Sequence, residues 1–205
     1  MTALGCFLAV EGLDGSGGTT QVALLADALR TRGIEVLITG EPTRTLPIGR
    51  LIRQALRGEE PLSDGVLPYL FAADRRDHLD REILPALARG AWVISDRYMA
   101  SSLAYQSLAA GFDYVVALNG RFRHPCLTLM LELDPSTSLG RVASRGEQRE
   151  RFEVLETLQR VHGAYHQALA WVQEQGAAVA IIDASPGVGQ VQAAVWAAVE
   201  RELLS

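Results

Sequence analysis

The sequence predicts a three-layer α/β fold, in which a five-stranded parallel sheet is covered by helices on both faces. Short apolar runs alternate with longer segments of helical period along the 205 residues, and such alternation is typical of parallel sheets. A glycine-rich turn, EGLDGSGGTTQ at residues 11–21, lies between the first apolar run and the first helical segment. Ligands of such folds bind beyond the carboxyl ends of the strands.

Five apolar runs are predicted as strands, because parallel strands that are buried on both faces read as nearly continuous apolar segments. These runs are Phe7–Val10, Val36–Thr39, Trp92–Ser95, Leu127–Leu133 and Val179–Ile182. Helices are predicted at Thr20–Thr31, Ile48–Leu56, Leu67–Leu87, Ala100–Leu118, Ser136–Ala143, Val154–Gln175 and Val188–Leu203. Gly33 and Gly90 follow predicted helix ends and suit left-handed caps.

The composition indicates a single domain over residues 1–205, since no Pro/Gly/Ser-rich run or composition shift divides the chain. The net charge of −5 argues against a general grip on nucleic acid, which needs a basic face. No apolar run approaches the ~20 residues of a membrane span and the N-terminus lacks a signal-peptide layout, so we expect a cytoplasmic protein without membrane contact. Cys6 and Cys126 lie in apolar stretches and are expected to be buried, reduced thiols.

The glycine-rich turn follows the pattern G-x-x-x-x-G-K-[ST] of phosphate-binding loops at Gly12, Gly17 and Thr19, but Gly18 occupies the lysine position. The whole chain contains no lysine, and all 19 basic side chains are arginine. Because the backbone N–H groups and the helix dipole remain, the loop still predicts a phosphate site, and Thr19 can offer its hydroxyl to magnesium. An uncompensated loss of the lysine predicts a turnover lower by about ten- to a few hundred-fold.

Polar residues follow the second and third predicted strands. Glu41 and Arg44 come near the carboxyl end of the second strand. Asp96 and Arg97 emerge together from the third, where Asp96 can hold magnesium through water and Arg97 can steady phosphoryl charge. A structural salt bridge between these two residues is the alternative.

The segment after the fourth strand carries arginines at 141, 145, 149 and 151. On a uniform helix these would form a solvated charged face. Gly146 interrupts the helical pattern, which favours a lid at about residues 141–153.

The histidines receive no functional role. His78 is expected on a helix surface or at a cap. His162 and His166 lie four residues apart, a spacing that permits a metal pair, but the sequence offers no third ligand, so we expect them on a helix surface.

The loop EGLDGSGGTTQ resembles the opening of thymidylate kinases, whose loop commonly reads EG-x-DG-x-GK-[ST]-T. Further motifs appear in the same order: GEPTRTLPIGRLIR at 40–53, LFAADRRDH at 70–78, SDRYMASSLAYQ at 95–106 and LELDPSTSLGRVASRGEQRERFE at 131–153. The resemblance implies a P-loop kinase fold that transfers the γ-phosphoryl group of ATP to dTMP with Mg²⁺, giving dTDP and ADP for dTTP biosynthesis. It also implies a homodimer.

The resemblance implies roles for individual residues as well. The ATP phosphates would lie on the loop residues Gly12, Gly15, Ser16, Gly17, Gly18, Thr19 and Thr20, with Arg141 as a weaker contact. The dTMP site would comprise Asp14 at the sugar, Glu41, Arg44 at the phosphate, Phe71 stacked on thymine, Arg75, Arg97, Ser102, Tyr105 and Gln106. Arg145, Arg149 and Arg151 would close over the transferred phosphoryl group beside Asp96 and Arg97, and Thr19 and Asp96 would hold magnesium.

Several alternatives stay open at the level of sequence. Phe71 by itself is typical of a core aromatic, Asp14 of a turn aspartate, and Arg44 of a surface arginine. For the whole chain, the alternatives are a catalytically silent relative that binds nucleotides and regulates a partner, and a kinase of another nucleoside or monophosphate.

Overall fold

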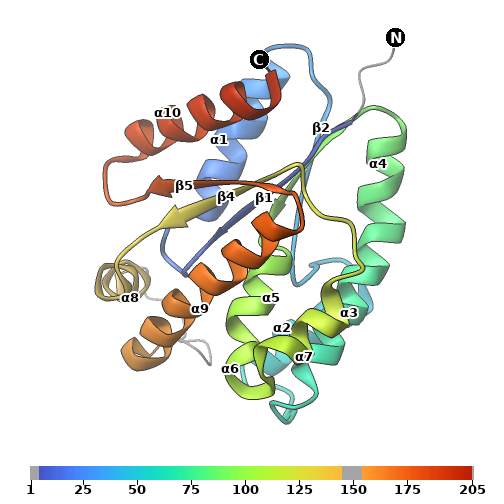
Figure 1. The fold of residues 1–205 in the computed structure, drawn as a ribbon, viewed down its shortest axis with the longest axis vertical. Coiled ribbons are helices and arrows are strands. Elements are labelled where there is room, and N and C mark those ends of the chain that lie inside the picture. The colour runs from blue at the N-terminus through green and yellow to red at the C-terminus, as the bar shows by residue number, and fades with distance from the viewer. Residues whose placement is uncertain (1–4, 145–153, 205) are drawn as a thin grey trace.

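The computed structural model describes residues 5–144 and 154–204 and contains a five-stranded parallel sheet in the order β2–β3–β1–β4–β5 (Figure 1). The strands are β1 (Phe7–Gly12), β2 (Val36–Gly40), β3 (Trp92–Asp96), β4 (Leu127–Glu132) and β5 (Ala178–Asp183). The predicted fold class is therefore confirmed, and each predicted strand overlaps an observed one.

Helical segments alternate with these strands along the chain. They are α1 (Gly18–Arg30), α2 (Pro47–Leu56), α3 (Leu67–His78), η1 (Leu79–Ile83), α4 (Leu84–Ala88), α5 (Met99–Tyr105), α6 (Ser107–Ala110), α7 (Phe112–Asn119), α8 (Pro135–Ala143), α9 (Leu155–Glu174), α10 (Val188–Val199) and η2 (Glu200–Leu204). Among the described residues, no helix is long and apolar enough to cross a membrane.

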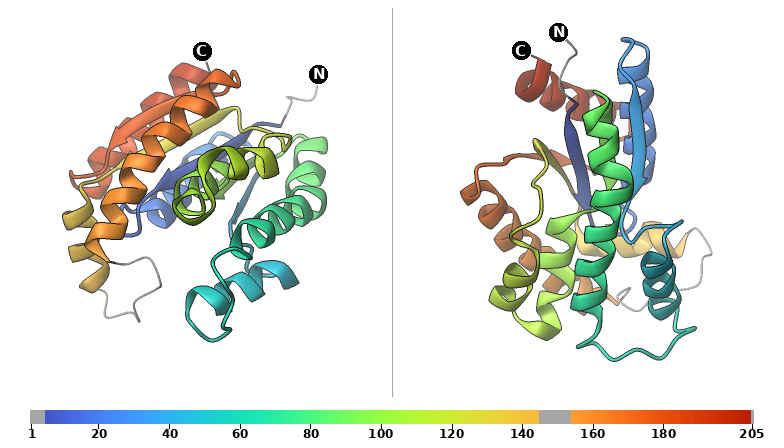
Figure 2. Two further views of the ribbon diagram at one scale, coloured as in Figure 1. Left: turned by 60° about the horizontal axis from the view of Figure 1, so that its bottom comes forward. Right: turned by 90° about the vertical axis from the view of Figure 1, so that its right-hand side faces the viewer.

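Two apolar layers fill the space between the sheet and the helices (Figures 1 and 2). Leu8 and Val10 of β1 face the layer under α1 and α10, whereas Phe7 and Ala9 face the layer under α5, α9 and η1. Successive side chains of a strand point to opposite faces, so a strand covered on both sides must be apolar throughout. This requirement explains why the central strands were visible as unbroken apolar runs.

The predicted helix Leu67–Leu87 is continuous but widens in its second half into the π-helical turn η1. Pro85 lies in the first turn of α4 and has no backbone N–H to donate to the preceding turn. Bonding of the i→i+5 type occurs mostly as single turns inside α-helices, and here that turn lies directly before α4, which contains the proline.

The prediction of one helix over Ala100–Leu118 is wrong, because this segment forms α5, α6 and α7. Gly111 separates α6 from α7 with a φ of 86°, a conformation that side chains with a Cβ rarely adopt. Left-handed glycines at the predicted caps Gly33 and Gly90 are confirmed, with φ of 78° and 88°.

The expectation for the two cysteines is half correct. Both are free thiols, but Cys126 is exposed, whereas Cys6 is buried. Cys126 precedes β4 and donates its backbone N–H to the carbonyl of Phe7 at 2.7 Å. It therefore lies at the amino-terminal edge of the sheet rather than within the apolar layers.

The register of the sheet brings three strand ends together at its carboxyl edge. Asp96, the last residue of β3, is level with Val10 of β1 on one side and with Gly40 of β2 on the other. The glycine-rich turn after β1 and the GEPTR segment after β2 consequently open on either side of Asp96.

Candidate functional site

The glycine-rich turn connects β1 to α1 and leaves the first turn of this helix open. Gly17 is the N-cap residue, with a φ of 96°, and it has no side chain that could accept hydrogen bonds from the first helical N–H groups. These donors and the positive end of the helix dipole point at the same place. The local structure is therefore that of an anion-binding loop.

Asp96 lies directly against this loop. Its Oδ2 accepts a hydrogen bond of 2.7 Å from the hydroxyl of Thr19. Its Oδ1 would be 3.1 Å from a Cβ atom placed on Gly18, which is tighter than ordinary van der Waals contact. A side chain at position 18 would require the Asp96 carboxylate to shift by a few tenths of an ångström, so glycine at this position permits the observed place of Asp96.

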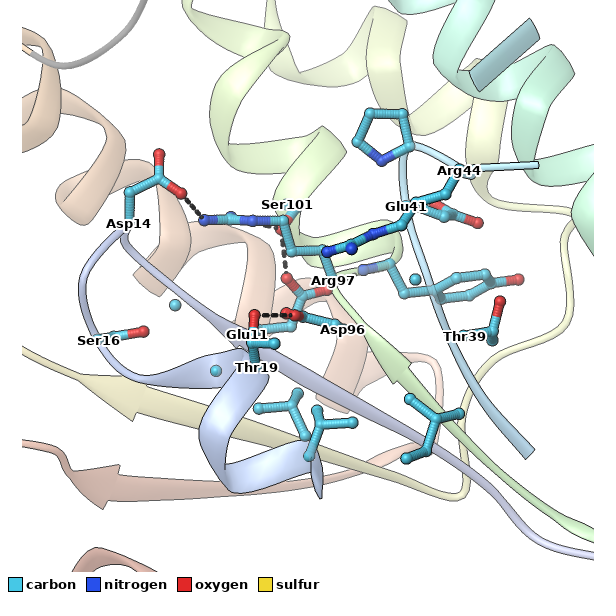
Figure 3. Close-up of a pocket in the computed structure, with 18 of the residues that line it drawn as sticks. Glu11, Asp14, Ser16, Thr19, Thr39, Glu41, Arg44, Asp96, Arg97 and Ser101 are labelled. Carbon is cyan, nitrogen blue, oxygen red and sulfur yellow. Dashed lines mark hydrogen bonds and ion pairs between the residues drawn. The ribbon is translucent and has the colours of Figure 1, made fainter. Parts of the chain in front are cut away.

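Arg97 follows Asp96 in a left-handed conformation, with a φ of 67° that is rare for a non-glycine residue. Its guanidinium binds Asp14 Oδ1 at 2.6 Å, Tyr165 at 3.1 Å and Ser101 at 3.2 Å. Asp96 and Arg97 therefore point to different partners, Thr19 and Asp14, rather than to each other (Figure 3). Burial lowers the pKa of Arg97, but Asp14 and, less strongly, Tyr105, Tyr165 and Asp96 together raise it by more, so the side chain is charged at neutral pH.

Glu11 is a buried carboxylate that the sequence analysis did not single out. It is 2% exposed and accepts hydrogen bonds from the backbone N–H of Tyr98 at 3.0 Å and from Ser101 at 2.5 Å. The hydroxyl of Tyr165, on α9, reaches Glu11 at 3.4 Å and the carbonyl of Gly12 at 3.2 Å. Glu11 thus joins the start of the loop to the β3–α5 turn and to α9.

One cavity of about 1200 Å³ extends from the loop to the segments after β2 and β3. Most of the site residues suggested by the sequence line it, and their side chains come from five separate segments. These lining residues are Gly12, Asp14, Gly15, Ser16, Gly17, Gly18, Thr19, Thr20, Glu41, Arg44, Phe71, Asp96, Arg97, Ser102, Tyr105 and Gln106.

Gln106 holds an unusual position in this lining. The residue is only 6% exposed, and within the described residues its Oε1 has no hydrogen-bond partner. A buried amide oxygen without a partner is unfavourable by about 1–3 kcal/mol. A ligand with a polar N–H edge would remove this penalty.

Arg75 does not line the cavity. Its side chain is fully buried, and the guanidinium binds Glu41 at 2.6 Å and Ser102 at 2.8 Å and also contacts Asn119. It therefore supports two residues of the lining from behind, and direct contact with a ligand stays a prediction.

The expectation of a helix-surface or capping role for His78 is wrong. His78 is fully buried, with one ring nitrogen 2.7 Å from Thr39 and the other 3.0 Å from Glu41. Together with Arg75 it fixes both oxygens of Glu41. No local sequence pattern indicates this role, because Thr39 and Glu41 are nearly 40 residues away in the chain.

The segment predicted as a lid is only partly described. Arg141 lies on α8 and donates to the carbonyls of Ala184 and Ser185, at 3.0 and 3.1 Å, rather than lining the cavity. Arg145, Arg149 and Arg151 fall outside the described residues.

Comparison with known proteins gives the same family that the motifs suggested. The family model for thymidylate kinase matches residues 10–195. The chain belongs to the thymidylate kinase family. It is 43% identical to a probable thymidylate kinase of Pyrobaculum calidifontis, over 97% of this chain and 98% of that protein. It is 37% identical to a probable thymidylate kinase of Pyrococcus horikoshii, over 98% of each chain, and 39% identical to a thymidylate kinase of Carboxydothermus hydrogenoformans, over 80% and 83%.

A pH-dependent stability is expected from Glu11. Burial raises the pKa of Glu11 above its ordinary value of 4.5. The folded state therefore holds a proton that the unfolded state releases as the pH rises above about 4.5, so Glu11 makes folding less favourable with increasing pH. The free energy of unfolding of the natural chain, minus that of Glu11→Gln, should fall as the pH rises from 4.5 and level off above the folded pKa. Urea titrations at a series of pH values measure this difference in unfolding free energy. A difference that grows with pH would contradict a raised pKa of Glu11.

Proposed function

We propose that this chain transfers the γ-phosphoryl group of ATP to dTMP, giving dTDP and ADP. The observation that carries the proposal is the joining, in one cavity, of an anion-binding loop and a second wall of polar and aromatic residues. A volume of about 1200 Å³ exceeds the ~300–1,000 Å³ that usually hold one small ligand, and suits two nucleotides placed end to end. The curated relatives bear the name of this activity.

On the donor side, the ATP phosphates would lie on the backbone N–H groups of the loop from Gly12 to Thr20. Magnesium would be held at Thr19 and Asp96, which fit it because they offer hard oxygen atoms that already lie 2.7 Å apart. A bound magnesium ion neutralises phosphate charge during transfer. Arg97, which is charged and held by Asp14, would lie beside the phosphoryl group during its transfer.

On the acceptor side, Arg44 is exposed at the cavity and would bind the dTMP phosphate. Phe71 would stack on thymine. Gln106 would pair with the polar edge of the base, which satisfies its unpartnered amide oxygen, and Ser102 and Tyr105 would complete this wall. Asp14 would accept from the sugar hydroxyl while holding Arg97, and Glu41, fixed by Arg75 and His78, would orient the substrate.

Chemistry of this kind depends on positioning and on positive charge around the phosphates, since the protein does little covalent work. Gly18 supplies no charge. We propose that Arg145, Arg149 and Arg151 of the predicted lid provide it from the other side of the phosphates, because guanidinium groups bind phosphate oxygens in a fork. We further propose that the chain is a single domain and acts as a homodimer in the cytoplasm. There it would supply dTDP for dTTP synthesis.

The direct test is turnover. With ATP, Mg²⁺ and dTMP, the purified chain should produce dTDP and ADP, and dUMP should compete only weakly for the acceptor site. Chromatography of the nucleotides, with both ligands shown to bind by calorimetry, separates the alternatives. Binding of ATP and dTMP without any dTDP at high enzyme concentration would instead identify a silent relative, and preferred use of dUMP would assign a different substrate.

Substitution of Phe71 tests the proposed dTMP side of the cavity. Replacing this ring with alanine should weaken dTMP binding by about ten- to a hundredfold, since stacking on a base contributes roughly 1–3 kcal/mol. ATP binding should change less than about twofold. Phe71→Leu separates stacking from apolar volume, and Phe112→Leu, at a phenylalanine outside the cavity, is the matched control. An equal loss of both nucleotides would show that Phe71 only supports the fold.

A further inference from the structure

A second group of chemically active side chains lies at the carboxyl end of β4, outside the cavity described above. His162 and His166 are one helical turn apart on α9, and Glu132 is the last residue of β4. Nε2 of His162 lies 2.5 Å from Oε1 of Glu132, and Nε2 of His166 lies 3.5 Å from the same oxygen. The structure thus supplies the third ligand that sequence could not, because Glu132 is 30 residues away from His162.

The three groups converge on one point. A ligand atom from each side chain lies within 4.8 Å of the other two. All three can act as lone-pair donors, and such atoms repel one another unless a proton or a cation lies between them. One proton satisfies the pair His162–Glu132, but 3.5 Å is too long for an ordinary hydrogen bond from His166. A metal ion would satisfy all three at once.

We propose that Glu132, His162 and His166 bind one divalent transition-metal ion of the Zn²⁺ class. Tetrahedral coordination with bonds of 2.0–2.2 Å places neighbouring ligand atoms about 3.3 Å apart. The His166–Glu132 separation of 3.5 Å is already close to that value. The 2.5 Å separation of His162 from Glu132 would have to increase by about 0.8 Å. Imidazole ligands select Zn²⁺, Co²⁺, Ni²⁺ or Cu²⁺ over Mg²⁺, which prefers oxygen.

Burial and exposure are also suitable for such a site. The side chain of His166 is 51% exposed, so an ion can enter and water can take the fourth position. Oε2 of Glu132 is buried without a hydrogen-bond partner among the described residues, so a cation at Oε1 would offset a carboxylate charge that is otherwise poorly compensated.

The ion would tie α9 to the end of β4 (Figure 1). Tyr165, on the same turn of α9 as the two histidines, contacts the carbonyl of Gly12 and the hydroxyl of Ser101. Metal binding would therefore stabilise the helix that supports the start of the phosphate loop. Because the ion binds the folded chain, it raises the free energy of unfolding.

Zinc titration of the full chain tests the proposal. Chelator-treated protein receives Zn²⁺ without nucleotide and with excess Mg²⁺, which occupies oxygen-ligand sites. Competition with a colour-forming chelator should show one Zn²⁺ per chain. At a concentration about a hundred times Kd, the melting temperature should rise by roughly 5–10 °C.

Variants assign the binding to these side chains. His166→Ala removes a half-exposed ligand, and Glu132→Gln keeps the shape while losing the charge. Each should weaken zinc binding by at least about tenfold and abolish most of the thermal shift. His124→Gln and Cys126→Ser, which remove a histidine and an exposed thiol elsewhere, should leave Kd unchanged. No stoichiometric binding, equal affinity in His166→Ala, or loss of binding in Cys126→Ser would overturn the proposal.

Discussion

The contact of the Asp96 carboxylate with the glycine-rich loop is the constraint on which the rest of the site depends. The register of β3 with β1 places Asp96 level with Val10, so the carboxylate emerges beside the loop that follows β1. One oxygen accepts from Thr19, and the other would lie only 3.1 Å from a Cβ atom at position 18. The absence of a lysine therefore leaves more than a missing charge. Glycine at position 18 also lets the Asp96 carboxylate lie close to the backbone of the loop, beside the place proposed for the phosphates.

A buried polar network holds this contact in place. Glu11 and Tyr165 fix the beginning of the loop, and Asp14 fixes Arg97 in its unusual backbone conformation. A second network of Glu41, Arg75 and His78 holds the opposite wall. Polar groups that are hydrogen-bonded to one another in a low-dielectric interior rigidify their surroundings. Such preorganisation is the main contribution a protein makes to phosphoryl transfer, which needs accurate positioning more than covalent chemistry.

The fold could be read from sequence because the three central strands are covered on both faces and so are apolar over most of their length. The site motifs could be read because they follow directly on strand ends, as Asp96 and Arg97 do. Other features depend on contacts between distant segments. The roles of Glu11 and His78 and the meeting of Glu132 with His162 leave no local pattern, since their partners lie 30 to 154 residues away. The break at Gly111 was missed because helical segments lie on both sides of it. The exposure of Cys126 was missed because the mostly apolar strand that follows it drew the expectation, although Arg123 and His124 precede it.

The most direct measurement concerns how the chain transfers a phosphoryl group with glycine at position 18. Turnover would be compared for Gly18→Ala and Gly18→Lys, which share a Cβ and differ in charge, each with Arg149 present and in the Arg149→Ala background. If the arginines already supply the charge, the lysine and alanine variants should differ by less than about tenfold when Arg149 is present, and by clearly more when it is replaced. Neither should exceed the natural chain in turnover, because the added Cβ would crowd the Asp96 carboxylate. A rise of about a hundredfold over the natural chain in Gly18→Lys, with the same gain in both backgrounds, would contradict this explanation and show that the natural loop is impaired.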